Sequence, residues 1–156
     1  TTEIYTLSLH DALPIFMAGS GDMLVHVIRR VAKLGIADRF HFTGFLRGDE
    51  VQKMFGMSDV YVMPSVSEPF GISPLEAMKS NVPVIISKQS GVAEVLDYAI
   101  KVDYWDVDAM ADAIYGLLKY PSLAAMSAEK GKSEVINLKW DNAAGEVLDV
   151  YRSLVG

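Results

Sequence analysis

Two acidic residues eight positions apart, Glu68 and Glu76, have the type and setting in this 156-residue sequence that best suit ligand chemistry. Glu68 is expected in a loop, followed by Pro69, where no helix or strand pairing uses its carboxylate. A carboxylate accepts hydrogen bonds from two hydroxyl groups, and a sugar ring supplies adjacent pairs of hydroxyls. The pair therefore indicates a receptor for a hydroxyl-rich ligand.

The segment between the two acids predicts a helix start that binds an anion. Ser73 is a favourable N-cap, Pro74 suits the first helical position, and Glu76 would complete a capping box with Ser73. Gly71 lets the backbone approach a ligand closely. Free N–H groups at a helix start favour a phosphate. An anion site between two carboxylates is a reasonable receptor for a nucleoside-diphosphate sugar.

Simpler roles for both acids stay open. Glu76 could be only the capping-box partner of Ser73, and Glu68 could be a solvated loop acid. The two roles of Glu76 compete, because a carboxylate folded back onto the Ser73 N–H is less free to reach a ribose. Because the carboxylate has two oxygens, one could accept from the Ser73 N–H while the other accepts from a ribose hydroxyl.

The elements that must position these acids alternate between apolar strands and amphipathic helices. We expect strands over 14–18, 40–43, 60–63, 82–86 and 99–102. We expect helices over 23–34, 49–55, 75–79, 93–96, 122–132 and 141–154, and one that starts at either Asp106 or Asp108 and runs through Lys119. Strands that are apolar throughout, with helices between them, indicate a parallel sheet covered on both faces. The predicted fold class is α/β, with a Rossmann-like, doubly wound parallel sheet whose ligands lie beyond the carboxyl ends of the strands. The loops to search are 19–22, 44–48, 64–73 and 87–91.

Composition excludes several classes of function. Hydrophobic residues make up 51% and charged residues 22%, which excludes a disordered tail, and no apolar run is long enough for a transmembrane segment. The formal charge of −6 argues against nucleic acid as a partner. Without cysteine there is no disulfide, thiolate nucleophile or zinc–thiolate site, which suits a cytoplasmic location.

Two glycine motifs do not meet their requirements. Gly19-Ser-Gly21 begins like a dinucleotide fingerprint, but Leu24 stands where the third glycine belongs, so only a tight strand-to-helix turn is indicated. Gly131-Lys-Ser133 ends like a P-loop, but Met126 replaces its first glycine and the stretch is expected within a helix.

Residues 1–15 fit poorly with the rest of the chain. The run YTLSLHDALPI resembles a translated sequencing adapter, and it lacks the features of a signal peptide. We therefore expect a non-native segment over 1–15 and a nucleotide-sugar-binding, Rossmann-like domain over 16–156. A native amphipathic arm is the alternative.

The segment SEPFGISPLEAM resembles the E-x7-E signature of retaining glycosyltransferases of the GT-B fold, particularly the GT4 (group 1) family. Other segments agree in order and spacing: MAGSGD, RFHFTGF, MSDVYVMPS, NVPVIIS, SGVAEVL and the Trp-Asp-Asn before the last helix. The resemblance covers about 16–155, which corresponds to the C-terminal donor-binding domain without its first strand.

The resemblance implies a role for each matching position. Glu68 is the implied catalytic residue, which would contact the donor sugar near its reacting carbon, and Glu76 would hold the ribose. The other implied donor-binding residues are Phe70, Gly71 and Ile72 at the diphosphate, Gly19 and Gly21 along the cleft, Phe45 and Leu46 beside the base, and Ser90 and Gly91 in the next loop. No metal and no cofactor is implied, because the nucleoside-diphosphate sugar is a substrate.

Departures from the family shape the expected function. Asn81 stands where the family usually has glycine, and asparagine is the next best residue for a left-handed helix exit. The family's basic diphosphate-binding residues and its N-terminal acceptor domain have no counterpart in this sequence. We expect the donor-binding domain of a hexosyltransferase, inactive by itself, whose parent enzyme could contact a membrane peripherally. A binding-only module is the alternative, and an unrelated doubly wound domain, such as a dehydrogenase half or a receiver, is a third.

Overall fold

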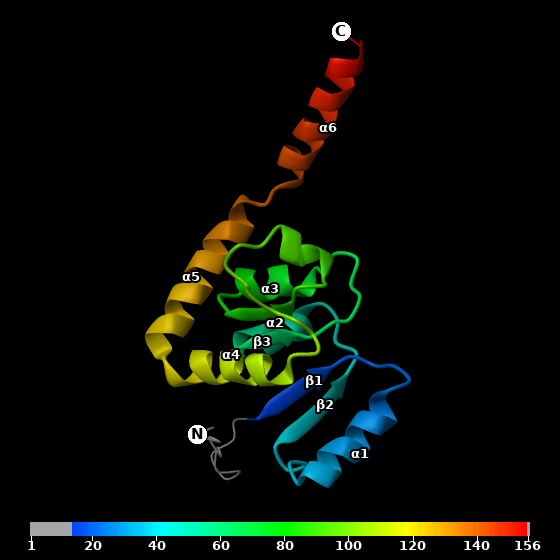
Figure 1. Ribbon diagram of the computed structural model, residues 1–156, viewed down its shortest axis with the longest axis vertical. Helices are drawn as coiled ribbons and strands as arrows, with labels where there is room; N and C mark the ends of the chain where they lie inside the picture. Colours follow the sequence, from blue (N-terminus) through cyan, green and yellow to red (C-terminus); the bar gives the residue numbers. More distant parts are fainter. Residues whose placement is uncertain (1–13, 156) are drawn as a thin grey trace. The chain divides into compact units, whose positions relative to one another are not determined.

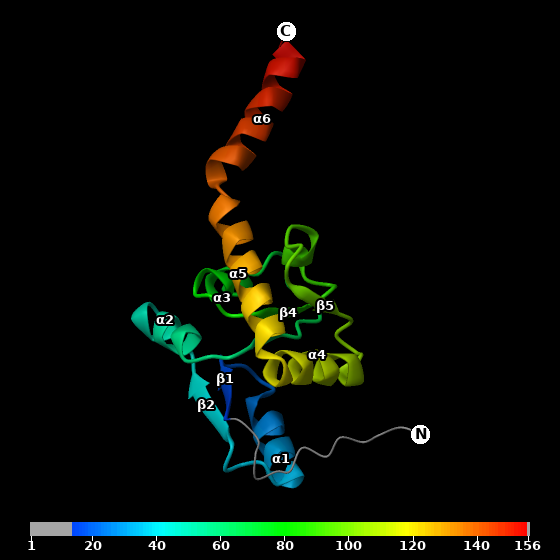
Figure 2. The same ribbon diagram turned by 90° about the vertical axis from the view of Figure 1, so that its left-hand side faces the viewer.

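The computed structural model describes residues 14–155 (Figures 1 and 2). Contacts between residues divide the chain into two compact units, the first ending at Val51 and the second beginning at Gln52. The predicted non-native segment lies almost entirely outside the described residues. Each unit is built from parallel strands and helices, as the sequence predicts.

The first unit contains a two-stranded parallel sheet and one long helix. Strand β1 (Ile15–Ala18) pairs with β2 (Phe40–Gly44), and α1 (Leu24–Leu34) connects them. Helix α1 turns its buried Val31 inward and ends at Gly35, whose φ of 70° is the left-handed exit expected there. Helix α2 (Asp49–Gly56) follows and spans the boundary between the units.

The second unit contains a three-stranded parallel sheet in the order β3-β4-β5. Its strands are β3 (Tyr61–Met63), β4 (Val84–Ser87) and β5 (Ile100–Val102). Its helices are α3 (Ser73–Lys79), the 3₁₀ helix η1 (Gly91–Glu94), α4 (Val107–Lys119), α5 (Pro121–Asn137) and α6 (Trp140–Val155). Figure 2 shows α5 passing both α3 and α4.

The core of the second unit lies around β4. Successive strand residues face opposite sides of a sheet, and all four residues of β4 are buried, so both faces are covered. Ile85 packs with Val102 and with Leu117 of α4. Helix α5 approaches α3 so closely that a Cβ on Gly131 would lie 2.8 Å from Met78 Cε. Gly131 thus lies inside a helix and packs against α3, which confirms that Gly131-Lys-Ser133 is not a P-loop.

The predicted fold class is confirmed, with differences in detail. The strands form two separate sheets rather than one, since β1 pairs with β2 and β3 with β4. Apolar runs identify strands but do not say which strands pair. The expected helix at 93–96 is a 3₁₀ helix at 91–94, and α5 extends to Asn137 rather than about 132. Among the described residues, no helix is long and apolar enough to cross a membrane.

Candidate functional site

The loop between β3 and α3, residues 64–72, holds Glu68 against the loop after β4. The N–H of Gly91 donates to the Glu68 carbonyl at 2.9 Å, and the N–H of Val92 donates to the Phe70 carbonyl at 2.8 Å. Glu68 and Ser90 also form an isolated parallel bridge. The structure therefore brings together four of the predicted site residues: Glu68, Phe70, Ser90 and Gly91.

Two glycines make this crossing of loops sterically possible. A Cβ on Gly91 would lie 1.9 Å from the carbonyl oxygen of Pro69, closer than any packing tolerates. Gly71 has a φ of 89°, and a Cβ there would lie 3.1 Å from both Glu68 Cγ and Met63 Cε. Only glycine combines this left-handed backbone with that close approach.

The predicted capping box between Ser73 and Glu76 is wrong. The N-cap of α3 is Ile72, without a side-chain cap, and Ser73 is the first residue of the helix. The Ser73 hydroxyl instead lies 2.8 Å from the hydroxyl of Tyr61 and donates a weak bond to the sulfur of Met63 at 3.9 Å. The Ser73 hydroxyl thus forms a hydrogen bond with Tyr61 of β3 instead of with the backbone at the start of α3. The Glu76 carboxylate is therefore not occupied by capping.

Both carboxylates lie within electrostatic reach of the Tyr61 hydroxyl. Burial raises the pKa of Tyr61 above 10.0, the hydrogen bond with Ser73 opposes this rise, and the negative charges of Glu68 and Glu76 add to it. Both acids are half-buried, and within residues 14–155 neither carboxylate accepts a hydrogen bond. Glu68 and Glu76 therefore flank one corner of the second unit, each with free acceptor oxygens.

Sequence reasoning missed Tyr61. It is the only residue of the short strand β3 with a polar side-chain group, and it lies just before the loop of interest. A hydroxyl on a half-buried strand requires a hydrogen-bond partner, and this requirement could have pointed to Tyr61 as a residue that fixes the neighbouring loop.

Backbone donors remain available between the two acids. Within the described part of the chain, the N–H groups of Phe70, Gly71 and Ile72 donate to no acceptor. The side chains of Phe70 and Ile72 are exposed. Helix α3 has only seven residues, so its dipole is short, and these unpaired N–H groups are the main feature that would favour an anion.

The remaining predicted site residues lie in the first unit. The N–H of Gly19 donates to the carbonyl of Gly44 at 2.8 Å, which places the turn after β1 beside the residue preceding Phe45 and Leu46. Gly19 has a φ of 127°, so its backbone depends on glycine. The Phe45 ring is exposed, and the Arg47 guanidinium lies 5.3 Å from its centroid. Gly21 lies in the same turn.

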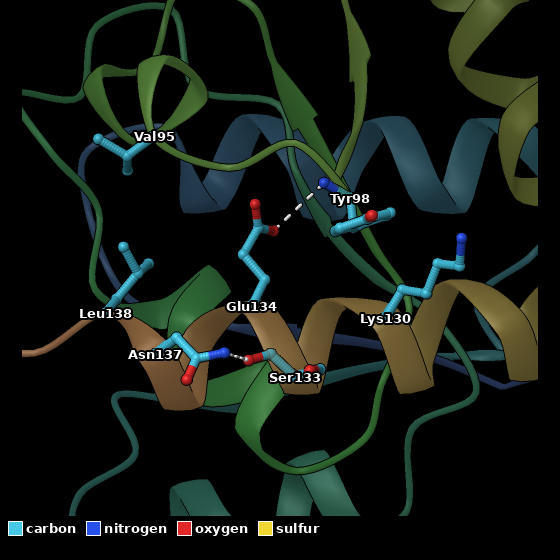
Figure 3. Close-up of a pocket in the computed structure, with 7 residues that line it drawn as sticks. All are labelled: Val95, Tyr98, Lys130, Ser133, Glu134, Asn137 and Leu138. Atoms are coloured by element: carbon cyan, nitrogen blue, oxygen red, sulfur yellow. Dashed lines mark hydrogen bonds between the residues drawn. The ribbon is translucent and has the colours of Figure 1, made fainter.

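A hollow of about 400 Å³ lies elsewhere in the second unit, between α5 and the segment before β5 (Figure 3). Its one carboxylate, Glu134, accepts hydrogen bonds from the N–H groups of Asp97 (2.6 Å) and Tyr98 (3.2 Å). The ammonium group of Lys130 lies 5.3 Å from the centroid of the Tyr98 ring. These contacts fasten α5 to the loop, and neither Glu68 nor Glu76 lines the hollow.

The chain matches the family model described as glycosyl transferases group 1 over residues 4–134. An uncharacterized glycosyltransferase of Methanocaldococcus jannaschii is 33% identical over 94% of this chain and 38% of its own length. The D-inositol 3-phosphate glycosyltransferase of Salinispora tropica is 31% identical over 88% of this chain and 30% of its own. The chain thus spans only about a third of the length of these curated relatives.

Solved structures agree on the fold. Sucrose-phosphate synthase from Thermosynechococcus elongatus superposes with a TM-score of 0.75 at 26% identity, covering 90% of this chain and 38% of that one. The C-terminal domain of a group 1 glycosyl transferase from Francisella tularensis gives 0.68 at 25% identity, covering 75% of this chain and 62% of that one. The chain therefore belongs to the group 1 glycosyltransferase family and has the Rossmann-like architecture of GT-B C-terminal domains.

Proposed function

We propose that this chain binds a nucleoside-diphosphate sugar as the donor-binding part of a retaining glycosyltransferase that moves a hexosyl group to a hydroxyl acceptor. The observation that supports this most directly is the shared corner of Glu68 and Glu76, with unpaired backbone N–H groups between them. Hydroxyl acceptors flanking anion donors complement a sugar and a nucleoside joined through a diphosphate.

Each group in the corner has a distinct proposed role. Glu76 accepts hydrogen bonds from the ribose hydroxyls, and the N–H groups of residues 70–72 face the diphosphate. Glu68 contacts the donor sugar, where its negative charge stabilises the positive charge that develops at the anomeric carbon. As the bond between that carbon and the diphosphate breaks, its electron pair goes to the diphosphate, and donor N–H groups stabilise the departing charge.

Other predicted residues complete the proposed site. Ser90 and Gly91 hold the loop of Glu68, and the donor-binding roles of Gly19, Gly21, Phe45 and Leu46 in the first unit stay predictions of the family resemblance. We propose that no cofactor takes part, since the nucleotide sugar is itself the substrate. We propose that these 156 residues alone bind the donor weakly and carry out no measurable transfer. A binding-only module is the alternative function.

Named relatives and neighbours support the class of ligand. A Mycobacterium tuberculosis relative, 29% identical over 91% of this chain, is named a GDP-mannose-dependent mannosyltransferase. The Anabaena protein HepE, which shares the fold with a TM-score of 0.77 at 18% identity, was solved in complex with UDP-glucose. These two donors differ in base and sugar but share the diphosphate and the ribose that our proposal assigns to residues 70–72 and Glu76.

Calorimetric titration of the chain with UDP-glucose, GDP-mannose and ADP-glucose tests the proposal. Saturable binding of at least one donor is expected, together with competition by the matching nucleoside diphosphate. Absence of binding by all three donors and by their nucleoside diphosphates would overturn it. Binding by the chain together with transfer by the longer parent enzyme separates an enzyme from a binding-only module.

A further inference from the structure

Two aromatic side chains, Tyr104 and Trp105, are displayed together at the carboxyl end of β5. Their ring centroids lie 4.9 Å apart with 83° between the ring planes, so one ring meets the other edge-on. Trp105 remains 62% exposed and Tyr104 37% exposed. Large aromatic rings contribute most when they are buried, so an adjacent exposed pair marks a candidate contact surface.

Hydrogen bonds fix the backbone beneath this aromatic pair. The Gln89 side chain accepts from the Tyr104 N–H at 3.3 Å and donates to the Asp103 carboxylate at 2.9 Å. Lys88 Nζ lies 2.8 Å from the second oxygen of the same carboxylate. These contacts lower the pKa of Asp103, first through Lys88 and then through Gln89. A surface held in place before binding loses less entropy when a ligand arrives.

The aromatic pair lies at the same edge of the sheet as the candidate site. Because β3, β4 and β5 are parallel, the turns after these strands lie at one edge. Lys88 and Gln89, which support the pair, continue directly into Ser90 and Gly91, which contact the backbone of Glu68. The pair is therefore two strands further along this edge than the loop of Glu68, with the loop after β4 between them.

The surroundings of the pair favour a neutral ligand. Asp103, Asp106 and Asp108 lie close to Trp105 in the sequence, and Lys88 is already paired with Asp103. This balance disfavours a phosphate or another anion. The face of an aromatic ring is electron-rich and attracts the polarised C–H groups on the apolar face of a pyranose.

We propose that Tyr104 and Trp105 form a stacking surface for a ring of a neutral oligosaccharide, on a backbone that Lys88 and Gln89 hold through Asp103 and the Tyr104 N–H. The inference goes beyond donor binding. It relies on the carbohydrate chemistry of the family but not on the nucleotide site. The saccharide would extend along the carboxyl edge of the sheet, from the proposed donor corner toward β5.

Tryptophan fluorescence tests this directly, because the sequence contains only Trp105 and Trp140. In a Trp140→Phe background, the whole chain is titrated with maltotriose and with an α-linked mannotriose. We expect a saturable blue shift of the Trp105 emission with at least one trisaccharide. Calorimetry then compares the native chain with its Trp105→Ala variant, both with Trp140 in place. The substitution should weaken the affinity for the trisaccharide by about tenfold. Tyr120→Ala, which removes another exposed aromatic ring, is the matched control and should leave the affinity unchanged.

The outcomes separate the two proposals. Trisaccharide binding that Trp105→Ala leaves unchanged, or no saturable binding of either trisaccharide, overturns the stacking surface. Loss of nucleotide binding in Glu76→Gln with trisaccharide binding intact shows that the two sites are independent. If the chain binds trisaccharide but no nucleotide, the donor site is refuted and the stacking surface stands. Thermal melting of each variant shows that its fold is kept.

Discussion

The hydroxyl of Tyr61, at the start of β3, lies 2.8 Å from the hydroxyl of Ser73, at the start of α3. This hydrogen bond closes the base of the segment that contains Glu68. The charges of Glu68 and Glu76 both raise the pKa of this half-buried phenol, so both acids lie near the Tyr61 hydroxyl. The hydrogen bond itself joins residues twelve positions apart in the sequence.

Removing either partner of the Tyr61–Ser73 bond should destabilise the fold modestly. Tyr61→Phe and Ser73→Ala should each lower the free energy of unfolding by about 1 kcal/mol. Each substitution removes one of the two hydroxyls and leaves the other without this hydrogen bond. The double variant should lose less than the sum of the two single losses. Urea denaturation of the four proteins measures this. Strictly additive losses would mean that the two hydroxyls do not interact in solution.

Most of the fold could be predicted from local patterns. Helical periodicity predicts α1 with its Gly35 exit, and Asp106 caps α4 by accepting from the Ala109 N–H at 2.9 Å, as its residue type suggests. Asn81 adopts the left-handed conformation, with a φ of 64°, expected where the family has glycine. Each of these features depends on residues only a few positions apart.

The parts that could not be predicted depend on distant residues. Ser73 is a sound N-cap by residue type, but Tyr61 takes its hydroxyl. Gly91 is expected only as part of a loop, whereas its necessity comes from the Pro69 carbonyl pressed against it. The pairing of strands into two sheets likewise depends on tertiary contacts that periodicity does not encode.

The crossing of the two loops can be tested at Gly91. Gly91→Ala places a methyl group against the Pro69 carbonyl, so the loops must separate, and we expect a loss of about 1–3 kcal/mol in stability. Gly116→Ala in α4 is the matched control, since a Cβ there would meet no atom within 4 Å apart from its chain neighbours and the nearby backbone of its own helix. Alanine there should leave stability unchanged or raise it by up to about 1 kcal/mol. Equal effects of the two substitutions in thermal melts would contradict the observed packing.

Residues 1–13 of the predicted non-native segment can be removed without touching a described element, whereas Ile15, at its end, belongs to β1. Strand β1 begins at Ile15, whose N–H donates to the Arg39 carbonyl at 2.8 Å. Deleting residues 1–13 should therefore leave the melting temperature nearly unchanged. A large drop in melting temperature, or failure of the shortened chain to fold, would show that the segment is an integral part of the domain.

Separate roles for the two acids predict different effects on donor binding and turnover. Glu76→Gln should weaken nucleotide affinity by about tenfold or more, because it removes a charged acceptor for the ribose hydroxyls. Glu68→Gln should change nucleoside-diphosphate affinity little and should mainly lower the turnover of a glycosyltransferase that carries this domain. Glu129→Gln, which neutralises an exposed acid on α5, serves as the control for lost charge. Calorimetry on the chain and rate measurements on such an enzyme would contradict this assignment if Glu68→Gln weakened nucleotide affinity and Glu76→Gln lowered only turnover.

The most direct test of the shared corner is the pKa of Tyr61, monitored by NMR of ¹³Cζ-labelled tyrosine and assigned with Tyr61→Phe. Burial raises this pKa above 10.0, and the nearby carboxylates raise it further because they disfavour the phenolate. Glu68→Gln and Glu76→Gln should each lower the pKa of Tyr61, whereas Glu129→Gln should not. A Tyr61 pKa that responds to neither Glu68→Gln nor Glu76→Gln would show that the two carboxylates do not face one corner, and the proposed donor site would be wrong.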